Sequence, residues 1–158
     1  MPADGPSKTK ADPKADVAAG LSKLLADSYA TYLKTHGYHW NVRGPNFAGL
    51  HALFMTQYTE EWAALDVIAE RIRALGELAP QGYGAFGNLS SIRDGDPTNG
   101  WEAMVDDLIA ANEAVAKTAA GVVEDAEAAG DAPTADLATQ RQTAHEKNVW
   151  MLRALSET

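Results

Sequence analysis

The chain has 158 residues and a formal net charge of −9, with 13 Lys and Arg against 22 Asp and Glu, and it has no cysteine. This length suits one domain, and the lack of cysteine excludes disulfides, thiolate zinc sites and iron–sulfur clusters, so any metal must bind nitrogen or oxygen ligands. The 30 Ala and 14 Leu outweigh 8 Val and 4 Ile. This balance predicts an all-α protein.

The acidic excess lies in the second part of the chain. After Arg93, 13 acidic residues face 4 basic ones, whereas the charges before that point cancel. Such a surface disfavours nucleic acid and attracts cations. The sequence resembles neither an apolar signal peptide nor a membrane span, so we expect a cytoplasmic protein with no membrane partner.

The chain divides into a short tail and one domain. Residues 1–16 are rich in Pro, Lys, Asp and Gly and have no apolar period, which predicts a mobile tail. Apolar residues begin to recur at three- and four-residue steps near Val17. We therefore place a single helical domain over residues 17–158.

Four long helices are predicted in this domain, each ended or preceded by Gly or Pro. We expect Asn46 to cap the second helix, whose inward stripe should include Tyr58 and Trp62. Four helices with one long middle connection form a ferritin-like bundle. The predicted helices span residues 17–43, 47–76, 101–129 and 134–155, and the connection at 77–100 has room for one short helix.

Two histidines face apolar surroundings on adjacent predicted helices. His39 ends the buried stripe of the first helix, and His51 has only apolar residues at its helical neighbour positions. Each is either a core histidine bonded to a backbone carbonyl or a metal ligand. The occurrence of two favours the ligand interpretation.

Two carboxylates stand four residues apart on the second helix. Like charges at this spacing, as in Asp66 and Glu70, repel by roughly 0.2–0.5 kcal/mol. Asp66 has no Lys or Arg at its helical neighbour positions, whereas Glu70 has Arg73. Burying such a pair is costly unless a cation neutralises it. With His39 and His51 they form a set suited to iron, manganese or zinc.

The helix geometry separates these two halves of the set. The 15 residues from His51 to Asp66 span roughly 22 Å at 1.5 Å per residue, whereas metal–ligand bonds measure about 2 Å. His51 and Asp66 of one chain therefore cannot bind the same ion. Either there are two unrelated sites, or a second chain delivers the carboxylates across a two-fold interface.

An intrachain di-iron centre is disfavoured. Ordinary di-iron bundles use a Glu-x-x-His motif. No glutamate stands three positions before any of the four histidines, where the chain has Leu33, His36, Ala48 and Gln142.

Two consecutive stretches resemble the Dps family, the mini-ferritins named as DNA-binding proteins from starved cells. The likeness rests on His39-Trp40-Asn41, on His51 twelve residues later, and on Asp66-x-x-x-Glu70-Arg71. It is close over residues 37–54 (GYHWNVRGPNFAGLHALF) and 64–76 (ALDVIAERIRALG), extends more loosely over residues 21–154, and leaves the tail outside.

The resemblance implies a shell of twelve subunits with ferroxidase centres at two-fold interfaces. His39 and His51 of one subunit, with Asp66 and Glu70 of its partner, would be the catalytic metal ligands. Family members bind Fe²⁺ there, oxidise it preferentially with hydrogen peroxide and store Fe³⁺ as mineral, which limits oxidative damage to DNA. Trp40 resembles the family's tryptophan near the centre, with an electron-donor or a packing role.

One position departs from the family pattern. Many relatives carry an Asp four residues after the second histidine, and this chain has Met55 there. A thioether is a poor ligand for Fe²⁺, so we predict one tight and one weak iron site per interface.

Other polar residues are weaker candidates. We expect His36 to have a role at the partly exposed surface and His145 to have a structural role. Asp131 and Asp136, near the start of the last helix, would either line cation pores of the shell or cap the helix.

The tail offers candidate DNA contacts. Lys8, Lys10 and Lys14 resemble the lysines of family members that bind DNA through an N-terminal arm. Three aspartates in the same segment offset their charge. We therefore expect weak DNA binding, which twelve tails acting together would strengthen.

The leading interpretation is a peroxide-dependent ferroxidase that stores iron. The alternative is a nucleoid-binding shell protein whose ferroxidase activity is weak or vestigial because of Met55.

Overall fold

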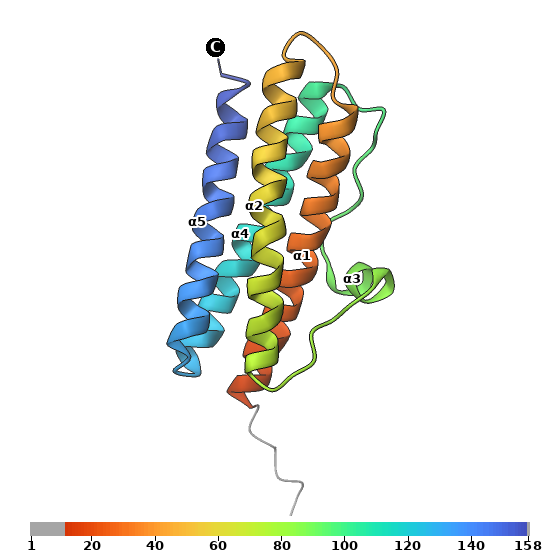
Figure 1. Cartoon of the computed structure of the whole chain (residues 1–158). Helices are drawn as coiled ribbons and strands as arrows, with labels where there is room; N and C mark the ends of the chain where they lie inside the picture. Colours follow the sequence, from red (N-terminus) through yellow and green to blue (C-terminus); the bar gives the residue numbers. More distant parts are fainter. Residues whose placement is uncertain (1–11, 158) are drawn as a thin grey trace, which may run out of the picture.

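The computed structural model describes residues 12–157, and this part of the chain is helical and has no strand. Four long helices form a bundle, and a short one lies beside it on the connection between the second and third long helices (Figure 1). The predicted ferritin-like layout is thus confirmed. The helices are α1 (Pro13–Asn41), α2 (Phe47–Ala74), α3 (Tyr83–Leu89), α4 (Trp101–Ala128) and α5 (Ala132–Ala154).

The long connection sets the directions of the helices. α1 and α2 run antiparallel, and the connection then returns along the bundle, so that α4 starts at the same end as α2 (Figure 1). α5 runs antiparallel to α4 and returns the chain to that end. This arrangement brings the end of α1 next to the start of α2, where both candidate histidines lie.

The ends of the helices follow local rules of capping. The carboxylate of Asp12 accepts the N–H of Lys14 at 3.0 Å, and Pro13 occupies the first turn, so Pro13–Asp16, predicted as the end of the tail, form the start of α1. Asn46 is at the N-cap of α2 as predicted, but its side chain makes no capping bond. Gly44 turns the chain between α1 and α2 with φ of +117°, a conformation that favours glycine.

Two separate apolar clusters fill the bundle. The first lies toward the start of α1 and the second toward its end. The first cluster consists of Val17, Leu21, Leu24, Leu25, Leu65, Ile68, Ile72, Val115, Ala119, Val122, Ala126 and Ala138. The second consists of Tyr38, Val42, Leu50, Phe54, Met104, Val105, Leu108 and Leu152.

A layer of buried polar side chains separates the two clusters. Each of the four long helices contributes to it at the point where its residues pass from one cluster to the other. Burying so many polar groups is costly unless they bind one another or water. We call this set the polar layer: Ser28, Thr31, Gln57, Glu61, Asn112, Arg141 and His145.

The inward face of α2 differs from the prediction. Trp62 was expected to face the core but is 56% exposed, whereas Gln57 and Glu61 are buried in its place. The prediction assigned the core by hydrophobicity, and the polar layer reverses that rule at the middle of the helix. Tyr58 is half-buried.

A buried aspartate ties the long connection to the bundle. One carboxylate oxygen of Asp27 accepts the N–H of Ser91 at 2.7 Å and the hydroxyl of Ser90 at 3.0 Å. The other accepts Lys23 Nζ at 2.6 Å and Thr118 Oγ1 at 2.8 Å. Asp27 thereby joins α1, α4 and the segment that follows α3.

Tyr38 provides a second attachment of the long connection to the bundle. The Tyr38 hydroxyl donates to Asp107 Oδ2 at 2.5 Å and accepts the N–H of Asp96 at 3.2 Å. Burial, followed by the Asp107 carboxylate, raises the pKa of Tyr38 to about 12. Gly95 passes so close that a Cβ there would lie 2.7 Å from the Tyr38 ring.

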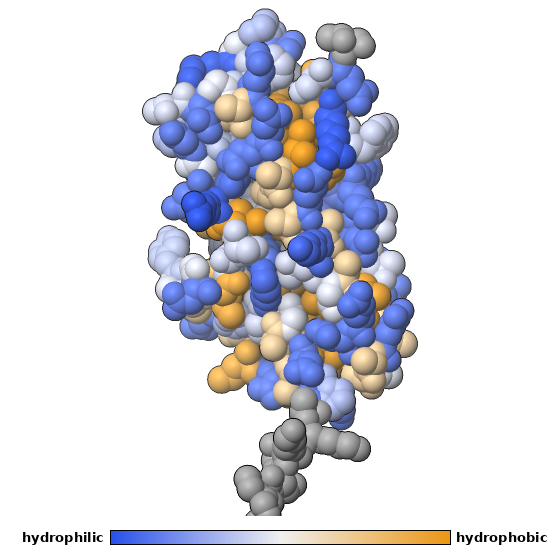
Figure 2. All heavy atoms as spheres, turned by 180° about the vertical axis from the view of Figure 1, so that it is seen from behind, coloured by the Kyte–Doolittle hydropathy of each residue, from blue (hydrophilic) through white to orange (hydrophobic). Residues whose placement is uncertain are grey.

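The face at the back of the view in Figure 1 carries no large apolar area. Figure 2 shows that this face is mostly hydrophilic, with small separate apolar patches. Among the described residues, no helix combines the length and apolar character that crossing a bilayer requires.

Candidate metal site

His39 and His51 lie side by side where α1 ends and α2 begins. Their rings stack with centroids 3.7 Å apart and planes 14° apart. Nδ1 of His39 donates to the backbone carbonyl of His51 at 2.7 Å, and Nδ1 of His51 donates to that of His39 at 2.6 Å. Each histidine thus fixes the other through its backbone.

These two bonds leave both Nε2 atoms as electron-pair donors. A carbonyl only accepts hydrogen bonds, so the proton of each neutral ring is on Nδ1. Metal-binding histidines commonly donate their second nitrogen to a carbonyl, which orients the ring and raises its basicity. The carbonyl-bonded and metal-binding interpretations of His39 and His51 are therefore compatible.

Aromatic side chains surround the pair. Tyr58 meets His39 edge-on with centroids 5.1 Å apart, and Phe47 stacks on His51 at 5.0 Å. His36 lies between Tyr58 and Trp40, at 4.4 and 4.2 Å from their ring centroids. Burial, followed by the charge of His39, lowers the pKa of His36, so its ring is neutral at pH 7. His36 is a packing partner of these rings.

The two candidate carboxylates lie elsewhere on the protomer. Asp66 and Glu70 are exposed on α2, and among residues 12–157 neither forms an ion pair. The premise that they are buried is therefore wrong for a single protomer. The described residues of one chain also contain no group of three or more His, Asp or Glu placed to share a metal ion. One protomer thus has a histidine pair and a carboxylate pair, and neither completes a site alone.

Large exposed side chains lie on the same two helices. Trp40 is 65% exposed, and Met55 and Trp62 are 52% and 56% exposed. Large apolar side chains gathered on one surface are typical of an interface. A second protomer on this surface would cover these side chains.

Comparisons with known proteins agree with this geometry. The ferritin-like domain family matches residues 18–158. A "DNA protection during starvation protein" of Brevibacillus brevis is 34% identical over 146 residues, which cover 89% of this chain and 95% of the relative. The chain is a member of the Dps family.

Solved Dps structures share the fold closely. A Dps crystal structure from Bacillus brevis superposes with a TM-score of 0.89 at 31% identity, over 94% of this chain and all of the other. A Dps protein from Vibrio cholerae O1, described as a member of a broad superfamily of ferritin-like diiron-carboxylate proteins, gives 0.87 at 26% identity, over 98% and 100% of the two chains.

The secondary candidates have different surroundings. Asp131 caps α5 by accepting the N–H of Thr134 at 3.1 Å, and it also pairs with Arg71 at 2.8 Å, so its capping role is confirmed. Asp136 is exposed and accepts Gln140 Nε2 at 2.9 Å, and its pore role stays a prediction.

The predicted DNA contacts lie only partly in the described structure. Lys8 and Lys10 lie outside the described residues, and Lys14 is exposed in the first turn of α1. DNA contact by all three lysines stays a prediction.

Two features were missed by the sequence analysis. The reciprocal carbonyl bonds of His39 and His51 depend on where the link after α1 places the start of α2, which no spacing rule gives. The polar layer had a visible signal, because Glu61 lies seven residues from both Phe54 and Ile68 and therefore on the same buried face of α2.

Proposed function

We propose that this Dps-family protein captures Fe²⁺ at sites shared between two protomers, oxidises it with hydrogen peroxide and stores the Fe³⁺ product inside a shell of twelve copies. His39 and His51 of one protomer and Asp66 and Glu70 of the next hold the iron. The proposed location is the cytoplasm, where removing Fe²⁺ and peroxide together protects DNA.

The observation that carries this proposal is the mutual locking of His39 and His51. Two imidazoles with Nδ1 committed to carbonyls present Nε2 lone pairs from adjacent rings, as a nitrogen-binding metal such as Fe²⁺ requires. They supply no negative charge. Asp66 and Glu70 of a partner supply two, which balances one divalent ion.

The electron balance sets the expected stoichiometry. Hydrogen peroxide takes up two electrons and two protons to give two molecules of water, and each Fe²⁺ supplies one electron. Two Fe²⁺ per peroxide therefore close the balance without a hydroxyl radical. If only one iron is bound, the second electron must come from elsewhere, and Trp40 is the candidate donor.

Assembly is tested by mass. Twelve copies of 16.8 kDa come to about 200 kDa, whereas a dimer would be about 34 kDa. Size-exclusion chromatography with light scattering distinguishes these states. A monomer with full iron affinity would contradict the shared site.

The activity is tested by the stoichiometry of peroxide consumption. Anaerobic titration with Fe²⁺ followed by peroxide should consume about one peroxide per two Fe²⁺, and His39→Ala and Asp66→Ala should each abolish this. Mixing the two variants after dissociation should restore some centres, because a mixed interface contains one intact half-set from each protomer. Failure of both variants alone together with recovery on mixing is the result that only a shared site gives.

The alternative function rests on Met55. Its exposed thioether stands where a carboxylate ligand is expected, so the centre would bind iron weakly and the protein would act mainly as a DNA-associated shell. The same titration decides between them, because the alternative requires little peroxide consumption and a gel shift with DNA at low salt.

A further inference from the structure

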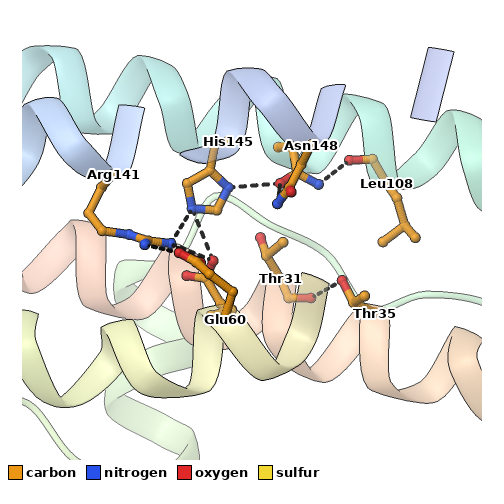
Figure 3. Close-up of polar contacts among 9 residues, drawn as sticks. Thr31, Thr35, Glu60, Leu108, Arg141, His145 and Asn148 are labelled. Atoms are coloured by element: carbon orange, nitrogen blue, oxygen red, sulfur yellow. Dashed lines mark hydrogen bonds and ion pairs between the residues drawn. The ribbon is translucent and has the colours of Figure 1, made fainter. Parts of the chain in front are cut away.

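The polar layer contains a buried charge that no part of the proposed iron chemistry uses. Arg141 extends from α5 toward α2, where it pairs with Glu60 and with Glu61 at 3.0 Å (Figure 3). Glu61 and His145 are fully buried, and Arg141 is almost so. A guanidinium so deep in a bundle needs a reason beyond surface solubility.

The hydrogen bonds around His145 place a proton on its Nδ1. Asn112 Nδ2 donates to the carbonyl of Leu108 at 2.8 Å, so Asn112 Oδ1 points to the other side and accepts from His145 Nδ1 at 2.8 Å. Nε2 lies 3.1 Å from Glu61 Oε2, to which it donates when the ring is protonated, and it presents a lone pair when the ring is neutral. This is the state in which imidazole binds metals.

One nitrogen of Arg141 occupies the point where two potential ligand atoms converge. Nη2 lies 3.0 Å from Glu61 Oε2 and 3.3 Å from His145 Nε2, and the carboxylate oxygen and the imidazole nitrogen lie 3.1 Å from each other. Two ligands that share one ion at bonds of about 2.0–2.2 Å lie roughly 3–3.5 Å apart. The carboxylate and the imidazole are thus spaced as two ligands of one cation.

Further buried polar atoms remain without a partner at the same level of the bundle. Among the described residues, no hydrogen bond reaches Gln57 Oε1, Gln57 Nε2 or Thr31 Oγ1, whereas Glu61 is paired with Arg141, His145 and Ser28. Buried polar atoms normally bind a partner. The unpaired atoms come from α1 and α2, so they face the layer from the side opposite to His145.

We infer that the polar layer is a divalent-cation site built from Glu61 and His145, and that Arg141 occupies it in place of the metal. Together with His145, the guanidinium stabilises the ionised form of the buried carboxylate, and it closes the bundle interior to metal ions. Bundle cores that bind metals do so with carboxylate and histidine side chains on facing helices, as Glu61 and His145 are placed. Iron is thereby confined to the sites between protomers. This inference does not depend on whether those sites are active.

The test removes the guanidinium and counts bound ions. Arg141→Ala is placed in a background of Asp66→Asn and Glu70→Gln, which weakens the sites between protomers while altering only exposed residues. Co²⁺ is the probe, because its visible spectrum reports nitrogen and oxygen ligands. We expect equilibrium dialysis to show one more bound Co²⁺ per chain than in the same background with Arg141. At a Co²⁺ concentration a hundredfold above Kd, the Tm of the Arg141→Ala protein should be roughly 5–10 °C higher than without Co²⁺.

Three controls make the result specific. Adding Glu61→Gln should abolish the additional Co²⁺. Arg141→Lys keeps the charge and should gain no ion. Arg153→Ala removes an exposed arginine of the same helix, which pairs with Glu113 at the surface, and should also gain none.

The inference is overturned if Arg141→Ala and the better-filling Arg141→Gln both gain no Co²⁺, or if the gain persists with Glu61→Gln. If Arg141→Ala is unfolded without metal, circular dichroism should show that Co²⁺ restores its helices and Mg²⁺ does not. A failure of that recovery, together with no gain in Arg141→Gln, overturns it equally.

Discussion

His39 and His51 each donate a hydrogen bond from Nδ1 to the backbone carbonyl of the other, and the two bonds have nearly the same length. The two residues therefore form a closed bridge between the last turn of α1 and the second turn of α2. The bridge has two consequences, one for the stability of the protomer and one for metal binding.

Replacing either histidine should reduce both properties at once. His39→Ala leaves Nδ1 of His51 without the fixed ring beside it and leaves the His51 carbonyl without its donor, so we expect a loss of about 1–3 kcal/mol in the free energy of unfolding. Fe²⁺ binding should also disappear. Urea unfolding and anaerobic titration measure the two effects.

His36→Ala is the matched control for this variant. His36 lies on the same helix and contacts aromatic rings, but it holds no backbone carbonyl among the described residues. It should keep Fe²⁺ affinity within about twofold. Equal losses for His36→Ala and His39→Ala would contradict the assignment of His39.

Met55→Asp should strengthen the second iron position. Met55 is exposed in the protomer, so the substitution leaves the core unchanged, and a carboxylate suits Fe²⁺ better than a thioether. We expect the native protein to bind one tight and one weak Fe²⁺ per interface and the variant to bind two tightly. Two equally tight ions in the native protein, found by anaerobic titration, would refute the weakening by Met55.

The sequence predicted the elements of the fold well because their signals are local. The four long helices end within a few residues of the predicted positions, since Gly44, Gly76 and Gly130 adopt the positive φ that stops a helix. His39 and His51 were grouped by their apolar surroundings and by the resemblance to the Dps family, and the structure places their rings side by side.

The sequence did not predict the polar layer in the middle of the bundle. Hydrophobic periodicity assigns a residue to the core by its apolar character, and it placed Trp62 inside. In the structure Glu61 takes that role, because Arg141 and His145 from α5 satisfy its charge across the bundle. Such compensation joins residues 80 positions apart and leaves no trace in a local window.

Trp40→Phe should change the by-products of oxidation more than its rate. Trp40 is mostly exposed next to His39 in the chain and packs on His36, so it is accessible as a donor of one electron. With Fe²⁺ limiting, peroxide needs a second electron, and a protein radical should form on this indole. Rapid-freeze electron paramagnetic resonance should show that radical in the native protein and reduce it severalfold in the variant.

The same variant separates the two interpretations of Trp40. A packing role alone predicts an unchanged radical signal and a lower Tm. Trp150→Phe, another exposed tryptophan, is the control and should leave the radical yield unchanged.

Asp27 should make the attachment of the long connection sensitive to acid. Burial raises the pKa of Asp27, but bonds from Lys23, the Ser91 N–H and Thr118 outweigh it and hold the pKa below 3.8. A carboxyl whose pKa is lower in the folded state contributes stability that is complete above its unfolded pKa of about 3.9 and is lost as the pH falls below it. The free energy of unfolding should therefore decrease steeply below pH 4.

Asp27→Asn should flatten this part of the profile and reduce stability at pH 7 by about 1–3 kcal/mol, because the amide cannot accept all five donors of the carboxylate. It should also expose the segment around α3 to proteases, since Ser90 and Ser91 lose their bonds to Asp27. Asp106→Asn, at an exposed position of α4, should change neither property. A steep loss of stability below pH 4 that persists in Asp27→Asn would assign the acid sensitivity to other carboxylates, of which Glu61 is the first to test.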